Sequence, residues 1–217
     1  MYLITIDGNI GVGKSTILRE LQEKYSYPIN LEPVDEWQPF LTDIYENDSG
    51  YFEFQVQVYL DRAFIQSRYD HTKVMFMERS PKFTKETFVE VLRKNNKLNQ
   101  HQFQTIQELY NHTDKKYNKT TTQPSVYIYI RLDPEKCLER ISKRSRDSEN
   151  MITLEYLKEL HDKHEECYNQ AKIQGYPIHV INGDNTVSNI VDEIRSYINV
   201  TSTGGNIENS QEYVSTV

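Results

Sequence analysis

The pattern Gly-x-x-x-x-Gly-Lys-Ser occurs once in this 217-residue chain, at residues 8–15, directly after the apolar stretch YLITI. Glycines let backbone N–H groups point at phosphate oxygens, and the helix expected from residue 16 adds the positive end of its dipole. Lys14 can then reach the β- and γ-phosphates, and the Ser15 hydroxyl can bind Mg²⁺. A turn that merely joins strand to helix is the alternative, but a chance match is on the order of one in a hundred. The pattern predicts a nucleotide-binding loop made of Gly8, Asn9, Ile10, Gly11, Val12, Gly13, Lys14, Ser15 and Thr16.

Two acids follow later apolar stretches: Glu32 ends the second, and Glu78 with Arg79 ends the third. In parallel α/β sheets ligands bind beyond the carboxyl ends of the strands, so these side chains should face the same crevice as the loop. Glu32 is placed to accept the proton of an attacking hydroxyl, and Glu78 to hold Mg²⁺ through water. Arg79 would be a cation facing a phosphate or a hydroxyl. The alternatives are a surface carboxylate at residue 32 and a local ion pair at residues 78 and 79.

A third group of charges, Arg140, Lys143, Arg144 and Arg146, follows the fourth apolar stretch. Arg140 and Arg144 are four residues apart and share one helix face. Cations on a segment that closes over a triphosphate would stabilise the transferring phosphoryl group and exclude water. A solvated basic helix face is the usual outcome for such a run, and only the nucleotide-binding loop elsewhere favours an arginine-rich lid.

The elements that must position these residues can be read from five short apolar stretches separated by helical ones. Nearly continuous apolar runs are typical of strands buried on both faces, and strands alternating with helices predict a parallel sheet. The sequence thus predicts an α/β P-loop kinase fold with a five-stranded parallel sheet and helices on both faces. Thr153 and Thr186 are expected to begin helices. The expected strands are Tyr2–Ile6, Tyr27–Leu31, Val74–Met77, Val126–Leu132 and Pro177–Ile181.

Length and composition limit the class of protein. The chain suits one domain, expected over residues 1–199, followed by a flexible polar tail at 200–217. The net charge of −7 argues against a polymeric nucleic acid partner, although a few local cations suffice for one nucleotide. Two cysteines without metal-ligand spacing, no apolar run long enough for a membrane and no visible targeting segment predict a cytoplasmic protein.

Several motifs in order resemble the deoxynucleoside kinases, the family of deoxycytidine kinase, deoxyguanosine kinase, mitochondrial thymidine kinase and the insect broad-specificity enzyme. The matching motifs are GNIGVGKST at 8–16, EPVDEW at 32–37, Tyr45 with Gln55, ERS at 78–80 and ERISKRSRDSEN at 139–150. The resemblance runs from residue 1 to about residue 198, which makes it far more specific than the loop alone. It implies ATP as phosphate donor, Mg²⁺, a deoxynucleoside acceptor and a homodimer.

The resemblance also implies roles for the matching positions. Glu32 would be the general base, with Lys14, Glu78 and Arg79 as the other catalytic residues and Ser15 with Glu78 at the metal. Arg140 and Arg144 would flank the ATP, and Arg146 would reach its phosphates. Tyr45 and Glu149 would bind the sugar 3′-hydroxyl, and Gln55 would read the base edge. The expected substrate-binding set is Glu32, Trp37, Tyr45, Phe54, Gln55, Arg62, Arg79, Thr84, Phe88 and Glu149.

The chain departs from the family at the base pocket. Arg62 resembles the arginine of the deoxycytidine and deoxyguanosine enzymes, but its usual acidic partner falls at Thr84, which carries no charge. Thymidine-accepting relatives lack both charges, so this chain has half of each pattern. The preferred base is therefore open, and Thr84 relaxes the pocket toward thymidine if Arg62 turns away.

The sequence therefore predicts ATP-dependent phosphorylation of a deoxynucleoside 5′-hydroxyl, a nucleotide salvage reaction. One alternative is a nucleoside monophosphate kinase such as thymidylate kinase, which would need extra cations in the acceptor crevice, where Glu32 would repel a phosphate. The other alternative is a non-catalytic P-loop module that switches a partner surface.

Overall fold

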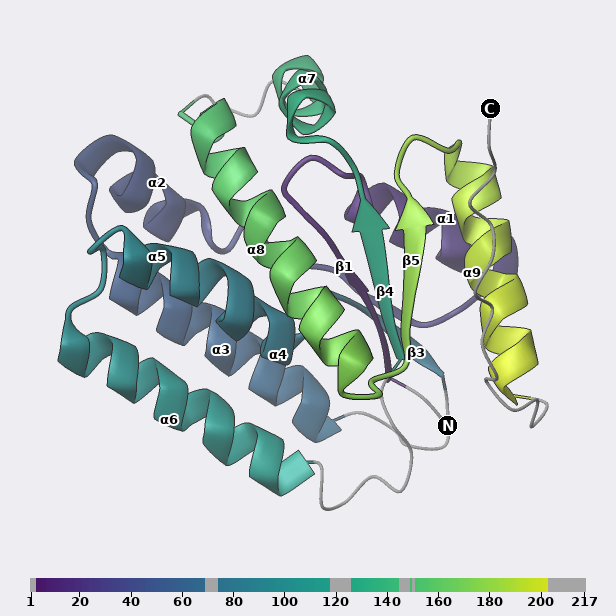
Figure 1. Ribbon diagram of the computed structural model, residues 1–217, viewed down its shortest axis with the longest axis horizontal. Coiled ribbons are helices and arrows are strands. Elements are labelled where there is room, and N and C mark those ends of the chain that lie inside the picture. The colour runs from purple at the N-terminus through teal and green to yellow at the C-terminus, as the bar shows by residue number, and fades with distance from the viewer. Residues whose placement is uncertain (1–2, 69–73, 118–125, 145–148, 150, 203–217) are drawn as a thin grey trace.

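The computed structural model of the chain describes residues 3–68, 74–117, 126–144, 149 and 151–202. Within these residues lies one sheet in the order β2-β3-β1-β4-β5, with every neighbouring pair parallel (Figure 1). The predicted five-stranded parallel sheet is confirmed. The strands are β1 (Leu3–Asp7), β2 (Ile29–Asn30), β3 (Met75–Glu78), β4 (Val126–Arg131) and β5 (Ile178–Asn182).

Helices cover both faces of the sheet, with α1 and α9 on one side and α3, α4, α6 and α8 on the other (Figure 1). Thr153 and Thr186 begin α8 and α9 as predicted, since their hydroxyls accept hydrogen bonds from the N–H groups of Tyr156 at 3.2 Å and Asn189 at 3.3 Å. The bounds are α1 (Lys14–Tyr25), α2 (Gln38–Asn47), α3 (Tyr51–Arg68), α4 (Pro81–Thr84), the π-helical turn η1 (Lys85–Val89), α5 (Glu90–Lys94), α6 (Gln100–Tyr117), α7 (Pro134–Arg144), α8 (Leu154–Ile173) and α9 (Val187–Ser202).

The side chains of β4 point alternately to the two faces of the sheet, so this strand contacts both layers of helices. Val126, Ile128 and Ile130 are buried in the apolar core that includes residues of α1 and α9. Tyr127 and Tyr129 belong to a separate cluster with residues of α4 and α8. Successive side chains of a strand point to opposite faces, so a strand with two layers to contact is apolar at nearly every position.

Two boundaries differ from the sequence prediction by more than one residue. The second strand is only Ile29–Asn30, shorter than Tyr27–Leu31, because it lies at the sheet edge between Pro28 and Pro33, which have no N–H to donate. Helix α9 runs to Ser202, past residue 199, and residues 203–217 of the expected tail lie outside the described residues. None of the described helices is both long and apolar enough to cross a membrane.

The parallel register brings the carboxyl ends of three strands together. Ile6 of β1 pairs with Glu78 of β3, and Met77 of β3 pairs with Asn30 of β2. The segments that follow these strands therefore begin side by side at one edge of the sheet. Those segments carry the nucleotide-binding loop, Glu32 and Arg79.

Candidate active site

A cavity of about 850 Å³ opens at this edge of the sheet and gathers most of the residues that the sequence singled out. Those that line it are Ile10, Gly11, Gly13, Lys14, Ser15, Thr16, Glu32, Trp37, Tyr45, Phe54, Gln55, Arg62, Glu78, Arg79, Thr84, Phe88, Arg144 and Glu149. Gly8, Asn9, Val12 and Arg140 are described but do not line the cavity, and Arg146 lies outside the described residues.

The phosphate loop, residues 8–16, depends on glycine at two close approaches. Gly8 and Gly11 have φ angles of 144° and 85°. A Cβ on Gly8 would lie 2.6 Å from the carbonyl oxygen of Ile130, and one on Gly11 would lie 2.6 Å from that of Cys137. The positive φ angles and the contacts with β4 and α7 both exclude a side chain at these positions. The strand–loop–helix context required for a phosphate cradle is thus present.

Lys14 sits inside this loop. Its Nζ donates to the carbonyl oxygens of Asn9 at 2.9 Å and Gly8 at 3.3 Å, and the residue is 5% exposed. Burial, with Arg79 nearby, lowers the pKa of Lys14 to about 8. Its acceptors are weak neutral carbonyls, which a phosphate oxygen can replace with a stronger, charge-assisted hydrogen bond.

Ser15 and Glu78 form the candidate magnesium site. The Ser15 hydroxyl lies 3.1 and 3.0 Å from the two carboxylate oxygens of Glu78. Among the described residues, no three His, Cys, Asp or Glu side chains gather as metal ligands. A hydroxyl and one carboxylate fit Mg²⁺, which is commonly held by one or two protein oxygens together with phosphates and water.

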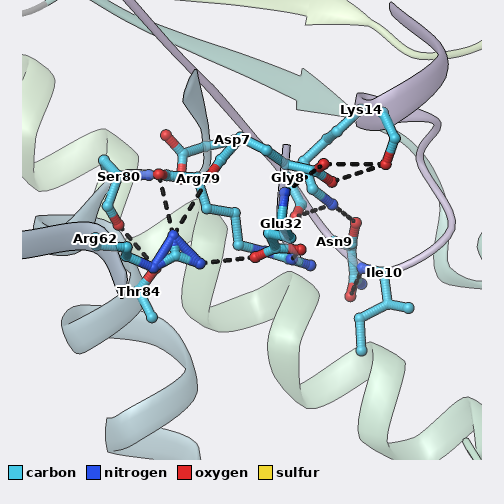
Figure 2. A network of polar contacts seen from close by, with 12 residues as sticks. Asp7, Gly8, Asn9, Ile10, Lys14, Glu32, Arg62, Arg79, Ser80 and Thr84 are labelled. Carbon is cyan, nitrogen blue, oxygen red and sulfur yellow. Dashed lines mark hydrogen bonds and ion pairs between the residues drawn. The ribbon is translucent and has the colours of Figure 1, made fainter. Parts of the chain in front are cut away.

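Glu32, Arg62 and Arg79 form a buried group of charges that we call the Glu32 cluster. Arg62 Nη2 donates to Glu32 Oε1 at 2.7 Å, and Arg79 Nη1 donates to Glu32 Oε2. The exposed fraction of each of the three side chains is 10% or less. Arg79 has a φ of 57°, and its N–H donates to the Ile6 carbonyl at 2.9 Å, so the turn after β3 is held against β1. Figure 2 shows the cluster between the phosphate loop and α4.

Glu32 and Glu78, two of the acids that line the cavity, have opposite pKa shifts. Burial by itself would raise the pKa of Glu32, but Arg79 and Arg62 outweigh it and hold the value at about 2. Burial raises the pKa of Glu78, and the negative charge of Glu32 raises it further. Glu32 is therefore an ionised carboxylate, while Glu78 gains from any cation that arrives beside it.

Aromatic side chains form the other wall of the cavity. Trp37 packs edge-on against Phe54 with ring centroids 5.5 Å apart, and its Nε1 donates to Asp61 at 2.7 Å. Gln55 is 4% exposed, and its Oε1 has no hydrogen-bond partner among the residues that the structure describes. The ring of Phe88 lies 4.8 Å from the guanidinium carbon of Arg79. A flat apolar slot with one buried amide acceptor is suited to a nucleobase.

The expected sugar-binding pair, Tyr45 and Glu149, lines the same cavity. Burial raises the pKa of Tyr45 to about 12, and the charge of Glu149 contributes. Glu149 is held by Arg144, whose Nε donates to Glu149 Oε2 at 2.5 Å and whose Nη2 donates to Oε1. The arginine expected at the ATP thus binds the acid expected at the sugar.

Arg140 braces the loop instead of lining the cavity. Its Nη1 donates to the Val12 carbonyl at 3.1 Å, and its Nη2 donates to the Gly183 carbonyl at 2.9 Å. These contacts tie α7 to the phosphate loop and to the turn after β5. A contact of Arg140 with ATP and the arginine-rich lid stay predictions.

Asp7 is a buried acid beside the phosphate loop that sequence reasoning missed, although it does not line the cavity. It is 2% exposed, and its Oδ1 accepts a hydrogen bond from the N–H of Ser80 at 3.0 Å (Figure 2). Burial raises the pKa of Asp7. The signal was available, because a charged residue that ends an apolar strand directly before a phosphate loop must face the site or be paired. Asp7 joins the first strand to the turn that carries Arg79.

A phosphate loop that faces a buried carboxylate across one cavity defines a P-loop phosphotransferase. Comparison with known proteins identifies the family. The family model described as "Deoxynucleoside kinase" matches residues 4–202. The 143R protein of Invertebrate iridescent virus 6 is 31% identical over 92% of this chain and 97% of its own length. Human mitochondrial thymidine kinase 2 is 26% identical, over 88% of this chain and 74% of its own length.

A solved structure of deoxyadenosine kinase from M. mycoides, with the products dCMP and a flexible dCDP bound, superposes with a TM-score of 0.77. It is 27% identical in sequence, and the match covers 91% of this chain and 98% of that one. The chain belongs to the deoxynucleoside kinase family, and it is an enzyme that phosphorylates deoxynucleosides with ATP. None of these matches favours a nucleoside monophosphate kinase or a non-catalytic switch.

Proposed function

We propose that ATP binds with its phosphates on the phosphate loop, that the deoxynucleoside fills the aromatic side of the same cavity, and that Glu32 is the general base. The observation that carries this proposal is that Glu32 and Lys14 line one cavity of about 850 Å³. That volume is sufficient for a nucleoside beside a triphosphate end. The proposed stacking of the base rests on the aromatic rings of Trp37, Phe54 and Phe88. The proposed binding of the sugar rests on Tyr45 and Glu149.

In the proposed step, the 5′-oxygen of the deoxynucleoside forms a bond to the γ-phosphorus. The bond from that phosphorus to the β–γ bridging oxygen breaks, and ADP leaves with the electron pair. The proton of the 5′-hydroxyl passes to Glu32. An ionised carboxylate of low pKa is adequate, because in a loose transition state the hydroxyl becomes strongly acidic only as its bond to phosphorus forms.

Cations around this centre supply the electrostatic part of the rate enhancement. Lys14 and Arg79 would stabilise negative charge on the transferred group from opposite sides. Mg²⁺, when bound, would neutralise charge on the β- and γ-phosphates, with Ser15 and Glu78 as the protein groups that hold it. Arg144 and Arg146 are proposed to reach the phosphates as well. The homodimer implied by the resemblance and the cytoplasmic location stay predictions.

The variant Glu32→Gln tests the assignment of the base. It keeps the shape of the side chain and removes the proton acceptor, so kcat should fall by about two to four decades while ATP still binds. Steady-state kinetics and ATP binding by calorimetry measure the two quantities. Glu36→Gln is the matched control, because Glu36 is exposed in the same segment and does not line the cavity. Near-normal turnover by Glu32→Gln removes Glu32 from the role.

A panel of acceptors tests the class and the preferred base together. The four deoxynucleosides and thymidylate are offered separately with ATP, and ADP formation is followed. Phosphorylation of at least one deoxynucleoside without phosphorylation of thymidylate is expected, since Glu32 repels a phosphate in the acceptor cavity. Faster turnover of thymidylate than of every deoxynucleoside would contradict the proposal.

A further inference from the structure

Arg62 lines the acceptor cavity, and within the described part of the chain its hydrogen bonds join it to Glu32 and to the turn after β3. It projects from α3 and is 4% exposed. Its Nη1 donates to the carbonyl oxygens of Glu78 at 3.3 Å and Arg79 at 3.2 Å, and its Nη2 donates to Glu32 Oε1 at 2.7 Å. The guanidinium therefore joins the Glu32 carboxylate to the backbone of the turn after β3 (Figure 2).

The neutral side chain of Thr84 accounts for this arrangement. An acid at that position would compete with Glu32 for the arginine, since a guanidinium binds a carboxylate more strongly than a hydroxyl. The Thr84 hydroxyl instead donates to the Ser80 carbonyl at 2.7 Å. Thr84 therefore offers Arg62 no charge, and Glu32 is the carboxylate to which Arg62 donates.

We propose that Arg62 is a positioning residue for Glu32 that acts on phosphoryl transfer with every deoxynucleoside, and not a reader of the base. This inference rests on the proposed role of Glu32 as general base. The planar guanidinium holds Glu32 Oε1 while two backbone carbonyls hold the guanidinium, so the carboxylate is fixed relative to Arg79 and Glu78. Each carboxylate oxygen has two lone pairs, so Glu32 can still accept the hydrogen bond of the 5′-hydroxyl.

Base recognition then falls to Gln55, whose buried Oε1 accepts no hydrogen bond from any described residue. The competing role for Arg62 is a contact with the base through Nε, which also has no hydrogen-bond partner in the described part of the chain. The two roles differ in what they predict. A positioning residue changes kcat alike for all acceptors and only while Glu32 is present, whereas a base reader changes the ranking of acceptors whether or not Glu32 is present.

A double-mutant cycle separates these roles. Arg62→Met is made in the natural chain and in the Glu32→Gln background, and kcat and KM are measured with each of the four deoxynucleosides. Arg62→Met should lower kcat by about 10- to 100-fold, the range expected when a catalytic group is misplaced by about 1 Å. In the Glu32→Gln background the same change should alter kcat by less than about 3-fold, because the group it positions is already lost.

Two control variants, together with a correction for the amount of folded enzyme, make the result interpretable. Arg62→Lys keeps the positive charge but has a single ammonium in place of the fork, so it should recover part of the lost kcat. Turnover is referred to folded enzyme, determined from the amplitude of thermal unfolding. Gln55→Leu is measured beside them and should change the ranking of the four acceptors by 10-fold or more, while Arg62→Met should change it by less than about 3-fold.

The outcomes distinguish the inference from the proposed function. If Glu32→Gln alone keeps near-normal turnover, the proposed function fails, and the inference fails with it. If Glu32→Gln is impaired and Arg62→Met multiplies that loss in full, the inference fails alone. It also fails if Arg62→Met alters the ranking of the deoxynucleosides by 10-fold or more with kcat retained for one of them.

Discussion

The phosphate loop and the Glu32 cluster lie in one cavity, yet they are built in different ways. In the loop, Lys14 donates to the carbonyls of Gly8 and Asn9, six and five residues away, and the buried ammonium faces carbonyls that a ligand can replace. In the Glu32 cluster, the ion pairs join residues 30 and 47 positions apart, and the charges satisfy one another. The phosphate loop, on the phosphate-donor side of the cavity, thus keeps a buried cation available for a bound phosphate. The Glu32 cluster, on the acceptor side, uses its charges to fix the positions of its own side chains.

Lys14→Met should lower the activity of the donor side without unfolding the protein. Its expected effect is larger than those of the changes that follow. The loss of one preorganised cation should lower kcat by about 10²- to 10³-fold. The free energy of unfolding should change by less than about 1 kcal/mol, because a buried cation of unfavourable desolvation is replaced by an apolar side chain of similar size. Steady-state kinetics and urea unfolding measure the two. Lys24→Met, at a partly exposed lysine of the same helix paired with Asp192, is the control and should keep its kcat.

Arg79→Met, on the acceptor side, should lower the stability of the fold. It leaves Glu32 buried with only Arg62, so the free energy of unfolding should fall by about 3 kcal/mol, as measured in urea. Arg93→Met removes a pair with Glu90 whose arginine is 52% exposed, and it should cost at most about 1 kcal/mol. Equal losses for Arg79→Met and Lys14→Met would remove the difference between the two sides.

Gly11→Ala tests how far the phosphate loop depends on its contacts with the rest of the fold. Gly11 and Gly175 have similar φ angles of 85° and 81°, so an alanine is strained at both positions. Of these two, only Gly11 has an added Cβ that meets a backbone carbonyl, that of Cys137 at 2.6 Å, while no atom of the described residues lies within 4 Å at Gly175. Gly11→Ala should therefore cost about 2 kcal/mol more than Gly175→Ala in urea unfolding. Equal costs would mean that backbone strain alone accounts for the glycine.

The smallest expected effect is the pH dependence of stability that comes from His164, a buried residue behind the acceptor side of the cavity. His164 is 2% exposed, and its ring lies 5.9 Å from that of Phe88, which in turn contacts Arg79. Burial lowers the pKa of His164 from 6.5 to about 3, and Arg79 and Lys14 add to the shift. Between those values the unfolded chain binds a proton that the folded chain does not, so stability falls as the pH falls from 6.5 toward 3.

Urea unfolding at pH 7.5 and 5.5 measures this contribution. The His164 term should make the natural chain about 1.4 kcal/mol less stable at the lower pH, and His164→Gln should lack that loss. The variant and the natural chain share their other titrating groups, so the difference between their two pH dependences isolates the histidine. Parallel pH dependences would show that His164 is protonated in the folded state.

Much of the fold and part of the site followed from sequence patterns alone. The ends of the five strands were predicted to within two residues, because buried parallel strands are continuous apolar runs. The side of the sheet on which Glu32, Glu78 and the phosphate loop meet followed from the carboxyl-end rule for parallel strands. Asp7 directly follows the predicted strand Tyr2–Ile6, so its burial beside Gly8 could have been predicted from the same rule.

The sequence by itself determined the strands, the phosphate loop and the motifs that identify the family, because each of these is a short run of residues that are neighbours in the chain. Only the tertiary structure decided how the charges pair. Arg62 binds Glu32 and not a group at position 84, Arg144 binds Glu149, and Arg140 braces the loop from outside the cavity. Long flexible cations reach whichever buried acceptor the fold brings within hydrogen-bond distance, and sequence spacing does not encode that distance.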